Sequence, residues 1–149
     1  MSPNHPAFIL HTSGSTGAPK FVEFSHVSFL FNSHMLFCDT HGFLNDEIIF
    51  STSTFGWIDS YQITTYGNLA RGGSSIIHEK IYTDSSHPEF IWKVASRHNV
   101  RCLETEPAQF VAIKNFDPEG KIFNELPFNK NFIVHSSGAK LIPSLLSWL

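Results

Sequence analysis

The chain has 149 residues, of which 42% are hydrophobic and 15% are charged, and its net charge is −3 at pH 7 with histidine neutral. This composition excludes a disordered chain, because disordered segments are poor in apolar residues and rich in net charge. The lysines and arginines form no run, so neither a nucleic acid nor an anionic membrane surface is an expected partner.

The first predicted elements flank a loop that is rich in glycine and hydroxyl side chains. Phe8 to Leu10 is an apolar run, which predicts the end of a buried strand. Ser25 is a good N-cap residue, and apolar side chains recur after it at helical spacing, which predicts a helix. We therefore expect the loop to connect a strand to a helix.

Beyond this helix, short apolar runs alternate with segments of helical periodicity. Strands are predicted at residues 47–51, 74–78, 100–104 and 132–135. Helices are predicted at residues 59–70 and 86–99, after Pro107 and after Pro143, and residues 124–131 are expected to be an exposed connection. Such alternation predicts an α/β fold with a mostly parallel sheet, in which ligands bind beyond the carboxyl ends of the strands.

Two of these helices carry more specific predictions. In the helix of residues 59–70, the spacing places Ile63, Tyr66 and Leu69 or Ala70 on the buried side. In the helix of residues 86–99, Ser86 and Glu89 have the spacing of a capping box. The buried face of that second helix is expected to contain Phe90, Ile91, Val94 and Ala95.

The cysteines and the N-terminus suggest no metal site, disulfide or targeting signal. Cys38 and Cys102 lie far apart and have no Cys/His ligand spacing around them. The first residues lack the basic and apolar regions of a signal peptide, and the uncharged stretch from Phe24 to Cys38 is shorter than the roughly 20 residues of a membrane span. We expect a cytoplasmic protein, or one in the mitochondrial matrix.

The loop after the first predicted strand has the chemistry of an anion-binding site. Its glycines allow tight turns that point backbone N–H groups at a phosphate, and its lysine adds a positive charge. The spacing is neither that of a Walker A loop nor that of a dinucleotide-binding loop, and on composition alone it could be a surface loop that binds nothing. The residues concerned are Thr12, Ser13, Gly14, Ser15, Thr16, Gly17, Ala18, Pro19 and Lys20.

These nine consecutive residues resemble the phosphate-binding signature of the adenylate-forming enzymes, the AMP-dependent synthetases and ligases. That family includes acyl-CoA and aryl-CoA synthetases, luciferases and the adenylation domains of peptide synthetases. The sequence departs from the pattern at Phe21, where the family normally has glycine. The resemblance implies that the β- and γ-phosphates of ATP are held by Thr12, Ser13, Gly14, Ser15, Thr16, Gly17 and Lys20.

A second segment, Phe55 to Gly73, is similar to the branch of acetyl-, propionyl- and acetoacetyl-CoA synthetases. This resemblance implies an acyl pocket formed by Trp57, Ile58, Asp59 and Ser137. Trp57 could equally be a packed core aromatic. A carboxylate in the acyl pocket would repel a carboxylate substrate, so Asp59 could equally be the N-cap of the helix that follows it.

A third segment, residues 136–140, resembles the loop whose backbone lies against adenine in this family. The resemblance implies that Gly138, Ala139 and Lys140 flank the adenine, with Lys140 in place of the usual proline. The segment could also be a simple connection between a strand and a helix. Thr105 and Pro107 match a Thr-x-Pro pattern that the family has at the end of a strand.

Taken together, the resemblance implies that residues 1–149 are a partial AMP-binding (adenylation) domain that runs from the phosphate loop to the adenine loop. It implies an acyl-CoA synthetase that uses ATP with Mg²⁺ and transfers a short-chain carboxylic acid to CoA through acyl-AMP. The family's magnesium, ribose and catalytic-lysine motifs follow later in its members, so no complete catalytic set is expected here, and the rest of an adenylation domain is an expected partner. The alternative is an inactive truncated remnant that acts at most as a nucleotide-binding or interaction module.

Overall fold

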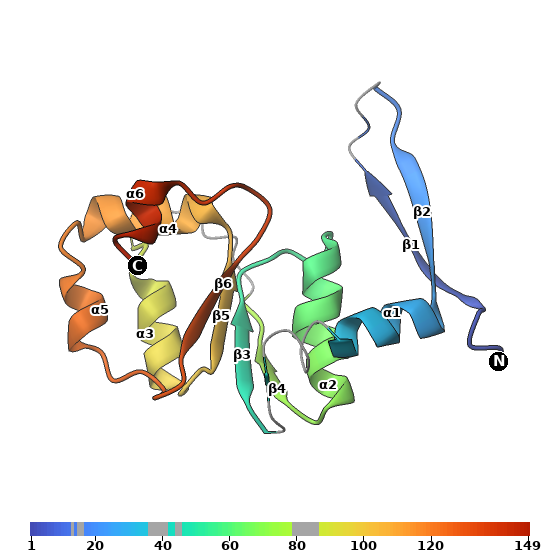
Figure 1. The fold of residues 1–149 in the computed structure, drawn as a ribbon, viewed down its shortest axis with the longest axis horizontal. Coiled ribbons are helices and arrows are strands. Elements are labelled where there is room, and N and C mark those ends of the chain that lie inside the picture. Colours follow the sequence, from blue (N-terminus) through green and yellow to red (C-terminus); the bar gives the residue numbers. More distant parts are fainter. Residues whose placement is uncertain (13, 15–16, 36–41, 44–45, 79–86) are drawn as a thin grey trace.

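A computed structural model describes residues 1–12, 14, 17–35, 42–43, 46–78 and 87–149 (Figure 1). These residues form a two-stranded antiparallel hairpin and a four-stranded parallel sheet with helices around it. Ser13, Ser15, Thr16, Cys38 and Ser86 are outside the described residues.

The hairpin consists of β1 (Pro6–Thr12) and β2 (Lys20–Ser25), with Thr12 opposite Lys20. It projects away from the rest of the molecule (Figure 1). The predicted strand at Phe8 to Leu10 is confirmed, but its predicted burial is wrong, since most of β1 is exposed. The predicted strand-to-helix loop is also wrong, because the residues after it first pair back with β1 as a second strand and reach the helix only at Ser25.

The predicted helix after Ser25 is confirmed as α1 (His26–His34). The Ser28 backbone N–H donates to Ser25 Oγ over 3.3 Å, which is the side-chain cap expected of a serine. An aromatic cluster holds the hairpin and α1 together. In it, the centroid of the buried Phe29 ring lies 4.4 Å from that of Phe8 and 5.1 Å from that of Tyr66.

The parallel sheet confirms the predicted fold class. Its strand order is β4-β3-β5-β6, and all neighbouring pairs are parallel. The strands are β3 (Ile48–Ser51), β4 (Ser74–Ile76), β5 (Cys102–Thr105) and β6 (Ile133–Ser136). Each of the four strands predicted after α1 is present, and their carboxyl ends lie at one edge of the sheet, as parallel pairing requires.

The predicted helix of residues 59–70 is mostly a π-helix, η2 (Ser60–Gly67), followed by the short α2 (Asn68–Ala70). The i→i+5 bonds of a π-helix widen each turn, yet the buried residues still recur three and four positions apart. The expectation that Tyr66 and either Leu69 or Ala70 are buried is wrong, since Tyr66 and Leu69 are 47% and 64% exposed and Ala70 is exposed too. The buried residues are Ser60, Ile63, Thr64, Gly67 and Asn68.

The remaining helices are α3 (Phe90–Arg97), α4 (Pro107–Phe116), α5 (Lys121–Glu125) and α6 (Pro143–Leu146). The helix α3 starts later than predicted, with Glu89 at its N-cap and no side-chain cap hydrogen bond from it. The helix α5 overlaps the segment that was expected to be an exposed connection. It forms because both carboxylate oxygens of Asp117 accept N–H groups of its first turn, over 3.0 and 2.8 Å.

Both faces of the sheet are packed, but unequally. The larger core lies between the sheet and the helices α3, α4 and α6 (Figure 1), and its centre is the fully buried Trp92 of α3. Trp92 was not among the predicted buried residues of α3, whereas Ile91 and Ala95 were, and both are buried. The smaller core on the other face consists of Phe43, Ile49, Ile63 and Cys102.

Among the helices of the described residues, none combines the length and the apolar character that crossing a bilayer requires.

Candidate functional site

The carboxyl ends of β3, β5 and β6 border a cavity of about 280 Å³. We call it the carboxyl-edge cavity. It brings together residues predicted for two different parts of the site, since Trp57 and Asp59 were assigned to the acyl pocket and Gly138 and Ala139 to the adenine loop. Its lining is Ser53, Trp57, Asp59, Glu106, Pro107, Ala108, Ser137, Gly138 and Ala139.

A second cavity of about 640 Å³, which we call the hairpin cavity, lies between the β1–β2 hairpin and residues 56–58. Thr12, the first residue of the predicted phosphate loop, is part of its wall, and so are Trp57 and Ile58. Trp57 therefore lines both cavities. The remaining lining residues are Leu10, His11, Val22, Phe24 and Gly56.

The described residues of the predicted phosphate loop lie where β1 ends and β2 begins. Gly14 and Gly17 have φ angles of +64° and +99°, which non-glycine residues rarely adopt. A Cβ atom on Gly14 would lie 2.3 Å from the carbonyl oxygen of Ala18, so the chain folds tightly on itself here. Lys20 is exposed at the start of β2. Of the described loop residues, Thr12 lines the hairpin cavity, and none lines the carboxyl-edge cavity.

Of the two alternatives left open, the one for Trp57 is wrong, and the one for Asp59 holds for its position alone. Trp57 is 62% exposed, so it is not a core aromatic. Asp59 stands at the N-cap position of η2, but its side chain makes no capping hydrogen bond. Instead, Asp59 Oδ2 accepts a hydrogen bond from Ser137 Oγ over 2.9 Å. This contact joins the segment after β3 to the loop after β6.

Behind Ser137 lies a carboxyl group that the sequence analysis missed. Glu104 of β5 is fully buried, and its carboxyl group accepts hydrogen bonds from Ser51 Oγ and, over 3.1 Å, from Ser137 Oγ. Burial raises the pKa of Glu104, and the nearby Asp59 raises it further, while the two serine hydroxyls lower it. A glutamate at the end of the strand predicted at residues 100–104 was the signal that could have identified it.

The predicted adenine loop is a tight turn at the same edge of the sheet. Gly138 has a φ angle of +85°, and a Cβ atom there would lie 3.8 Å from Cγ of Glu106. Gly138 and Ala139 line the carboxyl-edge cavity, whereas Lys140 is exposed and is not part of that lining. Within the described part of the chain, no group of three or more metal-ligating side chains lies together.

Comparison with known proteins identifies the family to which the chain belongs. A family model described as "AMP-binding enzyme" matches residues 1–149, so the chain belongs to the AMP-binding enzyme family, the adenylate-forming synthetases and ligases that its motifs resemble.

Three individual members of the family are similar to the chain over nearly its whole length. The chain is 28% identical over 152 aligned positions to acetyl-coenzyme A synthetase of Deinococcus radiodurans, covering 99% of this chain and 22% of that enzyme. It superposes on acetoacetyl-CoA synthetase from Streptomyces lividans with a TM-score of 0.77 at 21% identity, covering 99% and 22% of the two chains. It superposes on ATP-bound MatB from Rhodopseudomonas palustris with a TM-score of 0.79 at 21% identity, covering 99% and 27%. The chain thus spans about a fifth of the length of the enzymes named acetyl-coenzyme A synthetase.

Proposed function

We propose that residues 1–149 are a partial adenylation domain of an ATP-dependent acyl-CoA synthetase that activates a short-chain carboxylic acid. The carboxyl-edge cavity carries this proposal, because it unites residues 57 and 59 with residues 137–139. These residues are far apart in the sequence, and each set matches a different family segment. The similarity to enzymes named acetyl-coenzyme A synthetase supports a short acid.

In this proposal, the hairpin tip binds the polyphosphate of ATP. The described glycines, Gly14 and Gly17, keep the loop compact, and Lys20 neutralises phosphate charge, together with Thr12, Ser13, Ser15 and Thr16. Gly138, Ala139 and Lys140 flank the adenine, and Trp57, Ile58, Asp59 and Ser137 form the acid site. ATP bound to MatB, a structural neighbour, is consistent with this assignment.

The reaction is attack by a carboxylate oxygen of the acid on the α-phosphorus of ATP, which releases pyrophosphate and leaves acyl-AMP for transfer to CoA. The residues present would align the two substrates and stabilise phosphate charge. The described residues offer no cluster of ligands for Mg²⁺, and the resemblance places the magnesium ligand of the family in a later segment. We expect the protein in the cytoplasm or the mitochondrial matrix.

A second candidate function is a non-catalytic interaction module. The observation that favours it is the exposed apolar surface of the hairpin, where Phe21 is 77% exposed and Ile9 is 59% exposed. Exposed apolar surface of this kind marks a contact with another polypeptide. The remainder of an adenylation domain would be such a contact in the first proposal, and a different protein would be in the second.

Two measurements on the protein expressed from its whole reading frame test the proposal. We expect a fluorescent ATP analogue to bind. We expect Lys20→Ala to weaken that binding about tenfold or more, because the ammonium group of Lys20 neutralises phosphate charge. Lys130→Ala, an exposed lysine outside the site, should leave the binding unchanged. Equal binding by both variants, or none by the unmodified protein, would contradict the proposal.

The second measurement is carboxylate-dependent exchange between ATP and pyrophosphate. We expect none from residues 1–149 alone, because the resemblance places the catalytic lysine and the magnesium ligand in later segments. Exchange by these residues that disappears with Lys20→Ala would overturn this expectation. Exchange by a longer product of the same reading frame would decide against the inactive module.

A further inference from the structure

The loop after β6, which contains the predicted adenine residues, is attached to the interior of the sheet through Ser137. Ser137 Oγ lies 3.1 Å from Oε1 of Glu104 on β5 and 2.9 Å from Oδ2 of Asp59. Glu104 is fully buried, whereas Ser137 lines the carboxyl-edge cavity next to Gly138. Glu104 therefore holds the loop from behind and is not itself part of the cavity lining.

The carboxyl group of Glu104 also contacts the segment that follows β3. Its Oε2 atom accepts a hydrogen bond from Ser51 Oγ, and its Oε1 atom lies 3.4 Å from Ser53 Oγ. Because β5 pairs with both β3 and β6, this one carboxyl group joins the ends of three neighbouring strands. Its charge consequently acts on both sides of the cavity, where Ser53 and Ser137 are lining residues.

A count of protons shows which charge state these contacts fit. The hydroxyl of Ser137 carries one proton, so it can donate to only one of the two carboxyl groups beside it. A neutral Glu104 donates its own proton to Ser137 Oγ, and Ser137 then donates to Asp59. When Glu104 is ionised, one of the two contacts places an acceptor against an acceptor, and two negative charges face each other across a single hydroxyl.

The groups packed around Glu104 favour its neutral form. Burial raises the pKa of Glu104 most and Asp59 raises it further, while the serine hydroxyls and the charge of His135 on β6 lower it. On β5 itself, burial raises the pKa of Cys102 to about 12, so this thiol is neutral. The strand β3 contributes no titratable side chain, and Glu106, which precedes α4, is exposed at the cavity wall.

We propose that Glu104 is a positioning residue that fixes the predicted adenine loop through Ser137 only while it is neutral, so that the nucleotide binds more tightly to the protonated protein. When Glu104 ionises, the loop loses one of its two side-chain contacts beside Gly138 and Ala139. By linkage, bound ATP should favour protonation of Glu104 by the same factor. This inference rests on the proposed function, because it adds control by pH to the nucleotide site assigned there.

The pH dependence of nucleotide binding tests this inference. The dissociation constant of the fluorescent ATP analogue is measured between about pH 5 and 9, a range that covers a raised carboxyl pKa. The proteins compared are Glu104→Gln and the unmodified protein, both expressed from the whole reading frame. The amide of the variant can donate to Ser137 and accept from Ser51 at every pH, as the neutral acid does.

The result is expressed as the dissociation constant of the unmodified protein divided by that of Glu104→Gln. This ratio cancels the titration of the nucleotide and of the histidines, which both measurements share. We expect the ratio to rise about two- to tenfold as Glu104 ionises, the range for the loss of one hydrogen bond.

Further variants separate positioning from a merely structural role. Glu104→Leu has no donor, so it should bind the analogue weakly at every pH. Ser137→Ala removes the contact through which Glu104 acts, so its pH profile should have the shape of that of Glu104→Gln. Glu106→Gln is the matched control, since it removes a charge from the same cavity wall outside these hydrogen bonds, and its profile should follow that of the unmodified protein.

A second readout uses no nucleotide. The backbone amide shifts of Gly138 and Ala139 are followed by NMR over the same pH range, together with the side-chain carboxyl carbon of Glu104. We expect the amide shifts to change with the midpoint at which this carboxyl group titrates, because its charge state sets the position of the loop. The change should be absent from Glu104→Gln.

The inference is overturned if the ratio of dissociation constants does not change with pH, or if Ser137→Ala retains the pH profile of the unmodified protein. It is also overturned if the amides of Gly138 and Ala139 titrate equally in the unmodified protein and in Glu104→Gln. The two readouts keep the proposals apart. Lys20-dependent ATP binding without titration of the loop removes this inference alone, and titration of the loop without Lys20-dependent ATP binding removes the proposed function alone.

Discussion

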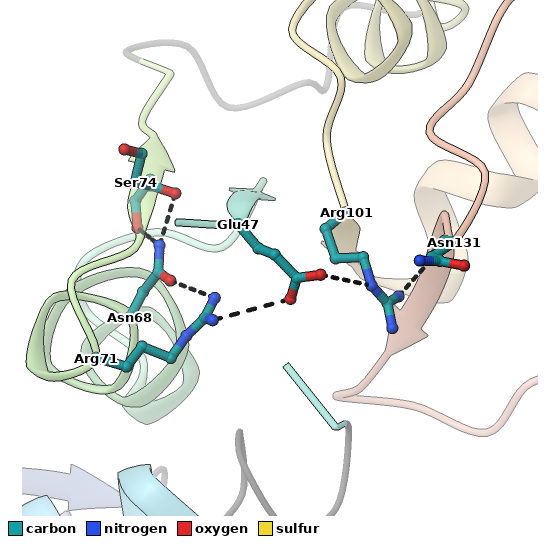
Figure 2. Close-up of polar contacts among 7 residues, drawn as sticks. Glu47, Asn68, Arg71, Ser74, Arg101 and Asn131 are labelled. Carbon is teal, nitrogen blue, oxygen red and sulfur yellow. Dashed lines mark hydrogen bonds and ion pairs between the residues drawn. The ribbon is translucent and has the colours of Figure 1, made fainter. Parts of the chain in front are cut away.

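Glu47 and Arg101 form an ion pair at the amino edge of the parallel sheet, with 3.2 Å between Glu47 Oε1 and Arg101 Nε (Figure 2). The other oxygen of the same carboxylate lies 3.9 Å from Nη1 of Arg71. Both guanidinium groups also lie over the ring of Phe43, at 5.2 and 5.4 Å from its centroid. One acidic side chain thus links the helical segment before β4 to the start of β5.

Glu47→Gln should lower the free energy of unfolding by about 2 kcal/mol, because two poorly exposed guanidinium groups lose their shared counter-charge. Urea denaturation measures the change. Glu119→Gln is the matched control, since Glu119 pairs with Lys121 at the surface, where ion pairs contribute little. Equal effects of the two substitutions would show that the Glu47 ion pairs do not stabilise the fold.

Trp92→Ala should lower the free energy of unfolding by about 3–5 kcal/mol, the cost of removing a large aromatic side chain from a packed core. Trp92 is 1% exposed, and its ring centroid is 5.2 Å from that of Phe123 and 5.8 Å from that of Phe110. Trp57→Ala, at a residue that is 62% exposed, should change stability little. A similar loss in both variants, measured by chemical denaturation, would count against this description of the core.

Glu104→Gln should become more stable relative to the unmodified protein as the pH rises. The folded-state pKa of Glu104 is raised, chiefly by burial, so folding favours its protonated form. That stabilisation is complete below the unfolded-state pKa and is lost as the pH rises through the folded-state pKa. The difference in unfolding free energy should therefore grow across this interval and stay constant above it. A difference that is independent of pH would show that Glu104 titrates normally.

Cys102 should not react with iodoacetamide at pH 8 in the folded protein. Burial, with the negative charge of Glu104 nearby, raises the pKa of this thiol to about 12, and the thiolate is the reactive form. Site-resolved mass spectrometry, with and without denaturant, measures alkylation at Cys102. Rapid labelling without denaturant would contradict the burial of this strand.

Gly14→Ala should weaken binding of the ATP analogue, because the loop can accept the methyl group only by changing its backbone conformation. The added methyl group would meet the Ala18 carbonyl oxygen at 2.3 Å, in a backbone conformation that already disfavours alanine. Gly56→Ala is the control, since nothing lies within 4 Å of its Cβ position and its φ is not in the left-handed region. Unaltered ATP binding by Gly14→Ala would show that phosphate binding does not depend on the backbone conformation of the loop at Gly14.

The sequence predicted the parallel sheet well because its strands are short apolar runs between clear turn signals. It predicted the strand at Phe8 to Leu10 but not its exposure, because these residues have the composition of an interior strand, although among the described residues β1 pairs with β2 alone. It missed the π-helical form of residues 60–67, since their buried residues recur at the spacing that is also typical of an α-helix.

For the candidate site, motif resemblance supplied residues at both ends of the chain, and the carboxyl-edge cavity places Trp57, Asp59, Ser137, Gly138 and Ala139 together. The role of each stays a prediction. Glu104 could not be assigned from its neighbours in the sequence, because its partners Ser51 and Ser137 approach it only after three strands have paired.

The shared wall between the two cavities has an optical consequence. Of the three tryptophans, Trp92 is buried and Trp148 is partly buried, whereas Trp57 is largely exposed and lines both cavities. The most red-shifted part of the intrinsic fluorescence should therefore come from a single indole. A molecule that binds in the hairpin cavity and one that binds in the carboxyl-edge cavity would both alter the fluorescence of Trp57. The order in which two ligands bind can therefore be followed by intrinsic fluorescence, without an added probe.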